Sequence, residues 1–259
     1  MDAVTRFEGI ATEYDAARPT PPREVTELLC QLSGVSRPDV VDLGAGTGLS
    51  TMIWSGVAGS VTAVEPGMDM GSILAARIAG HPEFTVLTAP AERTGLPDGC
   101  ADIVTASQAM HWFDPPRVIP EIARLLRPGG VFAAIDCDFP MTVSPEVDIA
   151  SRDFDDRLME LQIERGVVPP RADKAGHLGR LADSGLFRHT KEVGLHMRDV
   201  GTAARVLTLA NSMGGTGALL DLGVTEEELG LAALRETVTR ELTRPTTFWW
   251  TYRIRLAVR

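Results

Sequence analysis

Residues 40–50 read "VVDLGAGTGLS", an apolar run that leads into three glycines separated by single residues. The β-branched start predicts a buried strand, and glycines directly after a strand let backbone amides approach a ligand without side-chain interference. A dinucleotide-binding turn of the form G-x-G-x-x-G would need a small third residue at position 49, where Leu49 stands. The loop therefore predicts a phosphate or nucleoside site of a different kind. Its glycines are Gly44, Gly46 and Gly48, and Asp42 precedes them.

Short apolar runs alternate with helical stretches over residues 38–139, which predicts a mostly parallel sheet with helices on both faces. In such a sheet, ligands bind at the carboxyl ends of the strands. We therefore expect a doubly wound α/β fold with its site at that edge. The expected strands are residues 40–43, 61–65, 84–87, 101–106 and 131–136. The expected helices lie around 49–56, 69–79 and 116–126, the last ended by Pro128, Gly129 and Gly130.

The pattern changes after Asp138, where amphipathic helical stretches replace the strand and helix alternation. We expect helices over 145–165, 174–184 and 202–244, the last with a break at the glycine-rich 214–217 and an N-cap at Thr225. Two further strands are expected at 187–200 and 246–258. The predicted organisation is a helical lid at 1–30, a cofactor-binding core at 31–140, and helical cap insertions with the last two strands at 141–259. Together these parts are expected to form one compact domain.

Charge and composition limit the classes of partner. The chain of 259 residues carries 25 basic and 35 acidic side chains, a net charge of −10, which disfavours binding to nucleic acid. Its three cysteines lack metal-ligand spacing and suit a reducing compartment. The sequence shows no signal-peptide pattern and no apolar run of membrane length. We therefore expect a cytoplasmic, soluble protein without a membrane or nucleic-acid partner.

The stretch "VVDLGAGTG" resembles motif I of the class I S-adenosylmethionine-dependent methyltransferases. In "VTAVEP", Glu65 follows Asp42 by 23 residues, where that family places an acid that holds both ribose hydroxyls. "APAERTGLPDGCADIV" (89–104) resembles the next motif, and "LLRPGGVF" (125–132) resembles the segment entering the fifth strand. The resemblance implies a seven-stranded Rossmann-like sheet and S-adenosylmethionine as cofactor. The cofactor-binding residues that it implies are Asp42, Gly44, Ala45, Gly46, Thr47, Gly48, Glu65, Pro66, Ala91 and Glu92.

The two acids at the first two strand ends allow more than one interpretation. A carboxylate at a strand end can accept two hydroxyl donors, which would offset the cost of burying it. Glu65 could instead be a solvated strand-end acid before Pro66. Asp42 could contact the cofactor, anchor the glycine loop, or do both.

The segment "FEGIATEYDAARPTPP" (7–22) resembles the N-terminal lid of the methyltransferase type 11 subgroup, which includes trans-aconitate methyltransferase-like proteins. Members of that subgroup also carry an "HWFD" sequence after strand four, as this chain does at 111–114. The resemblance implies that Tyr14 covers the methionine end of the cofactor, where an aromatic face stabilises a cation by about 0.5–2 kcal/mol. It also implies that Arg18 fixes the lid. The alternative is an ordinary helix-end pair that holds the lid.

Residues 107–114 read "SQAMHWFD" and place His111 between large side chains at the end of the fourth strand. His111 could be a general base, because an imidazole titrates near neutral pH. It could also shape the acceptor side of the site with Trp112, while Gln108 faces the transferred methyl group. Third, it could pack the corner between strand and helix, with Asp114 capping the helix. The candidate catalytic residues are His111, Gln108 and Tyr14, with Gln108 also touching the cofactor.

Further acceptor contacts are expected from the stretch "RVLTLANSMG" (205–214), through Asn211 and Ser212. The other histidines, His177, His189 and His196, show no metal-ligand spacing, and we assign no metal. An already activated methyl donor mainly requires alignment and exclusion of water, and a base only for acceptors that must lose a proton.

The predicted function is methyl transfer to a small-molecule acceptor by in-line displacement, in specialised metabolism, by a monomer or homodimer. One alternative keeps the cofactor but changes the reaction to an intramolecular displacement or cyclisation, because binding does not dictate chemistry. Another is a non-catalytic ligand-binding partner subunit. The intact glycines and acids of the loop argue against such a degenerate chain.

Overall fold

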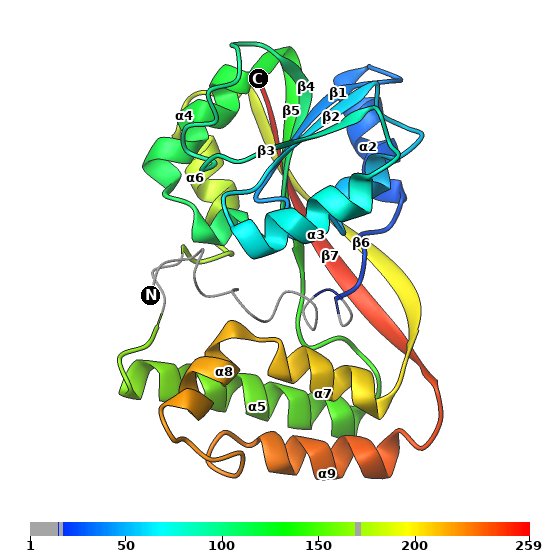
Figure 1. Cartoon of the computed structure of the whole chain (residues 1–259), viewed down its shortest axis with the longest axis vertical. Helices are drawn as coiled ribbons and strands as arrows, with labels where there is room; N and C mark the ends of the chain where they lie inside the picture. The colour runs from blue at the N-terminus through cyan, green and yellow to red at the C-terminus, as the bar shows by residue number, and fades with distance from the viewer. Residues whose placement is uncertain (1–14, 16–17, 169–171) are drawn as a thin grey trace. The chain divides into compact units, whose positions relative to one another are not determined.

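The computed structural model describes residue 15 and residues 18–168 and 172–259. Within this part the strands form a seven-stranded sheet in the order β3-β2-β1-β4-β5-β7-β6, which confirms the predicted fold class (Figure 1). The strands are β1 (Asp39–Leu43), β2 (Ser60–Val64), β3 (Phe84–Leu87), β4 (Ala101–Ser107), β5 (Leu126–Cys137), β6 (His189–Gly201) and β7 (Thr246–Val258).

The centre of the sheet is parallel, and its register brings the candidate residues together. β1 pairs in parallel with β2 and β4, β4 pairs in parallel with β5, and β7 runs antiparallel to β5. β1 and β4 are buried along nearly their whole length, as expected for strands covered on both faces. The register sets Asp42 beside Thr105, and Leu43 beside Val64 at the end of β2. The glycine loop therefore leaves the sheet level with Glu65.

Helices cover both faces of this parallel region. Figure 1 shows α2 and α3 on one side of the strands and α4 and α6 on the other. α4 carries buried Val118, Ile122 and Leu125 on one stripe, the spacing of an amphipathic helix. The helices are α2 (Glu24–Ser33), α3 (Met68–Ile78), α4 (Pro115–Leu125) and α6 (His177–Asp183), with 3-10 helices η2 (Thr51–Trp54) and η3 (Met110–Trp112).

Two local predictions in this region needed correction. The helix expected over 49–56 is only the 3-10 helix η2. Gly48 and Gly56 adopt φ values of 87° and 74°, which no right-handed helix includes, so they leave room for little more than one turn. The strand expected at 131–136 instead begins at Leu126 and includes the residues that were expected only to end the helix, and its register with β4 shifts between Ala101 and Ile103.

The chain divides into two compact units. One comprises residues 20–137, 170–195 and 252–259, and holds most of the sheet. The other comprises residues 1–19, 138–169 and 196–251. In this second unit α5 (Pro145–Glu164) packs against α8 (Gly214–Asp221) and α9 (Leu231–Glu241), and α7 (Ala203–Asn211) packs against α8 and α9. Its core includes Phe154, Leu158, Val206, Leu209, Leu234 and Val238.

Helix starts in the second unit differ from the expected ones. Thr225 and Glu228 exchange two hydrogen bonds, 2.9 and 3.2 Å long, as a capping box does. However, Gly230 then adopts a φ of 75°, so the capped segment is a separate turn and α9 starts at Leu231. The glycine-rich residues expected to break the helix instead begin α8, and the interruption is the extended Met213.

The predicted division at residue 30 falls inside α2, and the division at 140 lies close to the change of unit after Cys137. The lid predicted for residues 1–30 lies largely outside the described residues, and the three-part organisation stays a prediction. Across the ranges that are described, every helix is too short or too polar to cross a membrane.

Candidate functional site

The glycine loop lies at the carboxyl end of β1 and has two distinct surfaces. Gly44, Gly46 and Gly48 all adopt positive φ, between 58° and 87°. A Cβ at Gly44 would lie 2.7 Å from the Cβ of Ala109 and 3.0 Å from the Phe113 ring, so this glycine permits close packing against the 107–114 segment. Among the described residues, a Cβ at Gly46 would meet nothing within 4 Å. The backbone at Gly46 is therefore open to a ligand.

Asp42 anchors this loop from beneath. Its side chain is buried, and its two oxygens accept hydrogen bonds from Thr51 Oγ1 and Thr105 Oγ1, each 2.7 Å long. Burial raises the pKa of Asp42 to about 6, although the two hydroxyl donors act in the opposite direction. Of the two roles considered for Asp42, these contacts correspond to anchoring of the glycine loop. They link β1 to η2 and to β4.

Glu65 closes the other side of the loop. Its Oε2 accepts a hydrogen bond from the Gly46 amide at 2.9 Å, and its Oε1 accepts one from the Gly67 amide at 2.8 Å. The side chain is 9% exposed, and burial raises its pKa. A carboxylate offers about four acceptor positions, so each oxygen can still accept one more donor. Two neighbouring hydroxyls are the donors that such an acid suits.

The remaining predicted cofactor residues lie along the same edge. Ala45 is fixed by a hydrogen bond from its amide to the Val64 carbonyl, 3.0 Å long. Glu92 is half-buried, and its Oε1 accepts a hydrogen bond from the Asp114 amide at 2.9 Å. Asp114 itself occupies the N-cap position of α4 without a side-chain capping bond, contrary to expectation. Pro116 at the second helical position has no N–H to offer, and the Arg117 amide at the third donates to the Asp114 backbone carbonyl at 3.0 Å. Thr47 and Ala91 are buried and Pro66 is half-buried.

His111 and Gln108 follow β4 and are held by neighbouring segments. The buried His111 ring lies 4.8 Å from the half-buried Trp112 ring, and its carbonyl accepts the Ala172 amide at 2.8 Å. Gln108 adopts a φ of 51°, which is rare for a residue with a side chain. Its amide group donates to the Cys137 carbonyl at 3.1 Å and accepts from Lys174 Nζ at 2.7 Å. The predicted contact of Gln108 with the methyl group stays a prediction.

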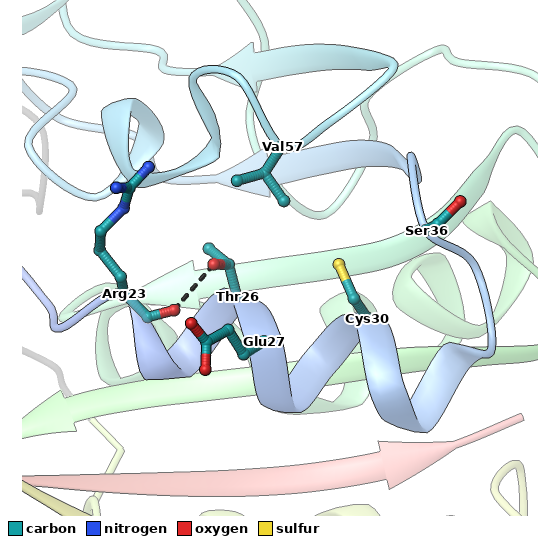
Figure 2. Close-up of a pocket in the computed structure, with 6 residues that line it drawn as sticks. All are labelled: Arg23, Thr26, Glu27, Cys30, Ser36 and Val57. Atoms are coloured by element: carbon teal, nitrogen blue, oxygen red, sulfur yellow. Dashed lines mark hydrogen bonds between the residues drawn. The ribbon is translucent and has the colours of Figure 1, made fainter.

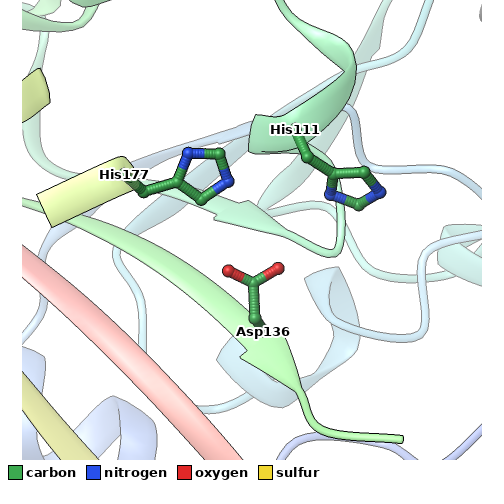
Figure 3. Close-up of side chains that lie close together, drawn as sticks. All are labelled: His111, Asp136 and His177. Carbon is green, nitrogen blue, oxygen red and sulfur yellow. The ribbon is translucent and has the colours of Figure 1, made fainter. Parts of the chain in front are cut away.

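A buried polar cluster lies beside these residues. Figure 3 shows the Asp136 carboxylate pointing between the rings of His111 and His177. One nitrogen of each ring and one carboxylate oxygen lie within 4.8 Å of one another. Asp136 is the penultimate residue of β5, His111 belongs to η3, and His177 begins α6. Three segments far apart in the chain therefore meet at one point.

Two cations accompany this cluster. Arg255 Nη1 lies 2.7 Å from Asp136 Oδ2, and its Nε lies 2.9 Å from Glu192 Oε2. Arg255 lies opposite Ala134 in the β5 and β7 register, so it is a diagonal neighbour of Asp136 on the same face. Lys174 Nζ lies 3.4 Å from Asp136 Oδ1.

Sequence reasoning did not select Asp136, Lys174, His177 or Arg255. An acid at the carboxyl end of a central strand was the signal used for Glu65, and the same signal applies to Asp136. Lys174 is one of only two lysines in the chain. His177 was not considered a metal ligand, because no second ligand stands at metal-binding spacing in the sequence. Its neighbours in the cluster come from distant parts of the chain.

Four of the predicted site residues belong to the other unit. Tyr14 lies outside the described residues, and Arg18 is half-buried. Asn211 is exposed and donates from Nδ2 to the Leu207 carbonyl at 2.8 Å. Ser212 is buried and donates from its hydroxyl to the Leu209 carbonyl at 2.8 Å. Their predicted lid and acceptor roles stay predictions.

A separate pocket of about 400 Å³ lies along α2 (Figure 2). Its lining includes Ser36 and Val57, which precede β1 and β2, so the pocket reaches toward the amino ends of these strands. Of the predicted site residues that the structure describes, none lines this pocket. The lining residues are Arg23, Thr26, Glu27, Cys30, Ser36 and Val57.

Comparison with known proteins identifies the central segment. A family described as a methyltransferase domain matches residues 41–134. An uncharacterized methyltransferase of Mycobacterium tuberculosis is 40% identical over 131 residues, which are 50% of this chain and 51% of that protein. A malonyl-[acyl-carrier protein] O-methyltransferase of Pectobacterium atrosepticum is 35% identical over 107 residues, 41% of each chain. The chain thus spans about half the length, or less, of these curated relatives.

Solved structures match over a longer range. A candidate type II methyltransferase from Anaeromyxobacter dehalogenans aligns with a TM-score of 0.67 and 25% identity, over 93% of this chain and 97% of that one. Phosphoethanolamine N-methyltransferase 2 of Haemonchus contortus aligns with a TM-score of 0.56 and 14% identity, over 96% and 56%. Residues 41–134 therefore match a methyltransferase domain, and the fold is the Rossmann-like fold of the methyltransferase structures that align with this chain.

Proposed function

We propose that the protein transfers a methyl group from S-adenosylmethionine to a small-molecule acceptor. The observation that carries this proposal is the pairing of Gly46 with Glu65. The open backbone at Gly46 lies beside an acid whose two oxygens each keep an acceptor position. A ribose offers two adjacent hydroxyl donors, which fit these positions. The match of the domain to methyltransferases supports the same assignment.

The cofactor would be held by the loop and by the ends of the next two strands. Glu65 would bind the ribose, the Gly44–Gly48 backbone would lie under the nucleoside, and Ala91 and Glu92 would flank the adenine. When bound, S-adenosylmethionine supplies an electrophilic methyl group on a positively charged sulfur. Tyr14 and Arg18 keep their proposed lid roles.

The work of the protein in this reaction would be alignment and exclusion of water. Such positioning can supply roughly 7–11 kcal/mol of the barrier. We place His111, Trp112 and Gln108 on the acceptor side, because they follow β4 next to the glycine loop. The net charge of −10 favours a small molecule over nucleic acid as acceptor. We also propose the trans-aconitate methyltransferase-like subgroup, on the "HWFD" sequence at 111–114.

Calorimetry with S-adenosylhomocysteine tests this function. We expect E65A to weaken binding by about 10- to 100-fold, because hydrogen bonds to a charged group contribute about 1.5–3 kcal/mol. Adenosine should bind the wild type more tightly than 3′-deoxyadenosine, and E65A should lose that preference. E27A is the matched control, because Glu27 is an exposed acid on α2. Equal binding of S-adenosylhomocysteine by E65A and wild type would contradict the ribose assignment.

Two further measurements separate the competing reactions. Turnover with a panel of small acceptors should release S-adenosylhomocysteine, whereas release of methylthioadenosine would indicate intramolecular displacement. A titration in which NAD binds more tightly than S-adenosylmethionine would overturn the family assignment.

A further inference from the structure

The proton of His177 has a defined position. The ring is fully buried, and its Nδ1 lies 3.0 Å from Arg180 Nη1. A guanidinium group is always protonated and only donates hydrogen bonds, so Nδ1 has to accept. Burial lowers the pKa of His177 to about 4, so the ring is neutral near pH 7. A neutral imidazole whose Nδ1 accepts carries its proton on Nε2. His177 therefore presents a donor to the cluster.

Asp136 presents an acceptor to the same cluster. Its Oδ2 accepts a hydrogen bond from Arg255 at 2.7 Å, whereas its Oδ1 is buried and accepts no hydrogen bond from the described residues. Lys174 Nζ forms an ion pair with this oxygen at 3.4 Å, but its hydrogen bond goes to Gln108 Oε1. His177 Nε2 is likewise buried, and the described part of the chain offers it no hydrogen-bond partner. Leaving such a group unsatisfied costs about 1–3 kcal/mol.

The chemistry of these two atoms restricts what can satisfy them. The missing group has to accept from His177 Nε2 and donate to Asp136 Oδ1. A hydroxyl does both, whereas a carboxylate only accepts and a protonated amine only donates. The spacing is compatible with this, because one nitrogen of each histidine and one Asp136 oxygen lie within 4.8 Å of one another, so a central oxygen would lie no more than about 2.8 Å from each.

A metal ion fits less well, although two histidines and one carboxylate are a common ligand set. A metal needs a lone pair on the histidine nitrogen, and the protonated Nε2 has none to give. Lys174, Arg180 and Arg255 also surround the cluster with positive charge, only part of which Asp136 and Glu192 offset.

We propose that His177 and Asp136, with His111 as the neighbouring wall, form a subsite that binds a hydroxyl group of the acceptor. The proposal rests on the proposed methyltransferase function, and it narrows the acceptor to an alcohol or phenol. Gln108 and Lys174 hold the rim of this subsite, because the amide of Gln108 links Lys174 to the end of β5.

The first test is the protonation state of His177, read by nitrogen-15 NMR of the imidazole rings in the full-length protein at pH 7. The signals of His177 are those missing from H177Q. We expect a neutral ring with the proton on Nε2, and R180A should populate both neutral forms. A proton on Nδ1, or a charged ring, would overturn the proposal.

The second test is a titration with phenol and with anisole, its methyl ether, which cannot donate. Phenol should shift the His177 signals until they saturate, and its Kd should be at least ten-fold lower than that of anisole. In binding assays H177F should lose this preference, and H177Q, which keeps an N–H donor, should retain part of it. D136N should lose it as well, with circular dichroism to verify folding. H189Q is the control, because His189 is exposed on β6.

Several outcomes would overturn the subsite. One is equal binding of phenol and anisole. A second is absence of phenol binding, which would indicate that a water molecule occupies the site. A third is binding of zinc chloride that the H177F substitution abolishes. Calorimetry of S-adenosylhomocysteine binding to the same variants distinguishes a failure of the proposed subsite from a failure of the proposed methyltransferase function. If S-adenosylhomocysteine binds normally but phenol is not preferred over anisole, only the subsite is refuted. If the wild-type protein does not bind S-adenosylhomocysteine, the proposed function is refuted.

Discussion

Asp42 and Asp136 are both buried acids of the sheet, 1% and 3% exposed, and they differ in their partners. Asp42 has a neutral hydroxyl donor on each oxygen and joins β1 to η2 and β4. Asp136 accepts a hydrogen bond from Arg255 on one oxygen, while the other lies 3.4 Å from Lys174 Nζ and accepts no hydrogen bond from the described residues. A buried acid with both oxygens satisfied serves as an anchor. One with an open position next to a buried donor is suited to a ligand.

The largest effect on stability is expected from substitution of Arg255, the cation that is paired with Asp136. R255M removes the buried partner of both Asp136 and Glu192, and breaking a buried ion pair on one side costs about 3–5 kcal/mol. The free energy of unfolding, from urea denaturation, measures this. R253M is the matched control, because Arg253 lies on the same strand and contacts the same Glu192 but is 48% exposed. Its cost should stay below about 1 kcal/mol. Similar costs for both variants would show that burial does not distinguish the pairs.

The pH dependence of stability should separate Asp42 from His177. The folded pKa of Asp42, about 6, lies above its ordinary 3.8, so its contribution is full below pH 4 and is lost as the pH rises through 6. The folded pKa of His177, about 4, lies below its ordinary 6.5, so its contribution is full above pH 6.5 and is lost as the pH falls toward 4. Each change amounts to about 3 kcal/mol, and the two oppose each other.

Variants at these two residues should therefore reveal opposite slopes. For D42N, the free energy of unfolding should rise by about 3 kcal/mol from pH 4 to pH 6.5, because His177 still contributes. For H177F, it should fall by about 2 kcal/mol from pH 4 to pH 6, because most of the Asp42 contribution is lost over this range. Burial also raises the pKa of Glu65, but this acid is present in both variants and cancels in their comparison. Parallel profiles, from denaturation at pH 4, 5, 6 and 7, would contradict these assignments.

A smaller effect is expected from a single donor to Asp42. T105V keeps the side-chain shape but removes one hydrogen bond, which should cost about 1–2 kcal/mol and raise the pKa of Asp42 further. T85V is the control, because Thr85 lies exposed on β3. Thermal unfolding at pH 7 measures both. An equal loss of stability in T85V would mean that the different β-strand propensities of threonine and valine, and not the hydrogen bond to Asp42, cause the effect.

Much of the fold could be predicted because its signals are local. The strand runs, the glycine spacing and the acid after β2 each lie within a few residues, and their expected positions are confirmed for β1 to β5. The errors occurred where one glycine conformation interrupts a helical pattern. The positive φ of Gly48, Gly56 and Gly230 shortened η2 and delayed α9. Glycine adopts either sign of φ, so composition does not show which one a turn requires.

By itself, the sequence determined the α/β class and the carboxyl edge at which Asp42, the glycine loop and Glu65 lie. These features follow from the periodicity of strands and helices and from the missing Cβ of glycine. The tertiary structure alone decided that His177 meets Asp136 beside His111, because residues far apart in the chain approach only when the sheet forms. It also decided the tautomer of His177, because Arg180 fixes which nitrogen accepts.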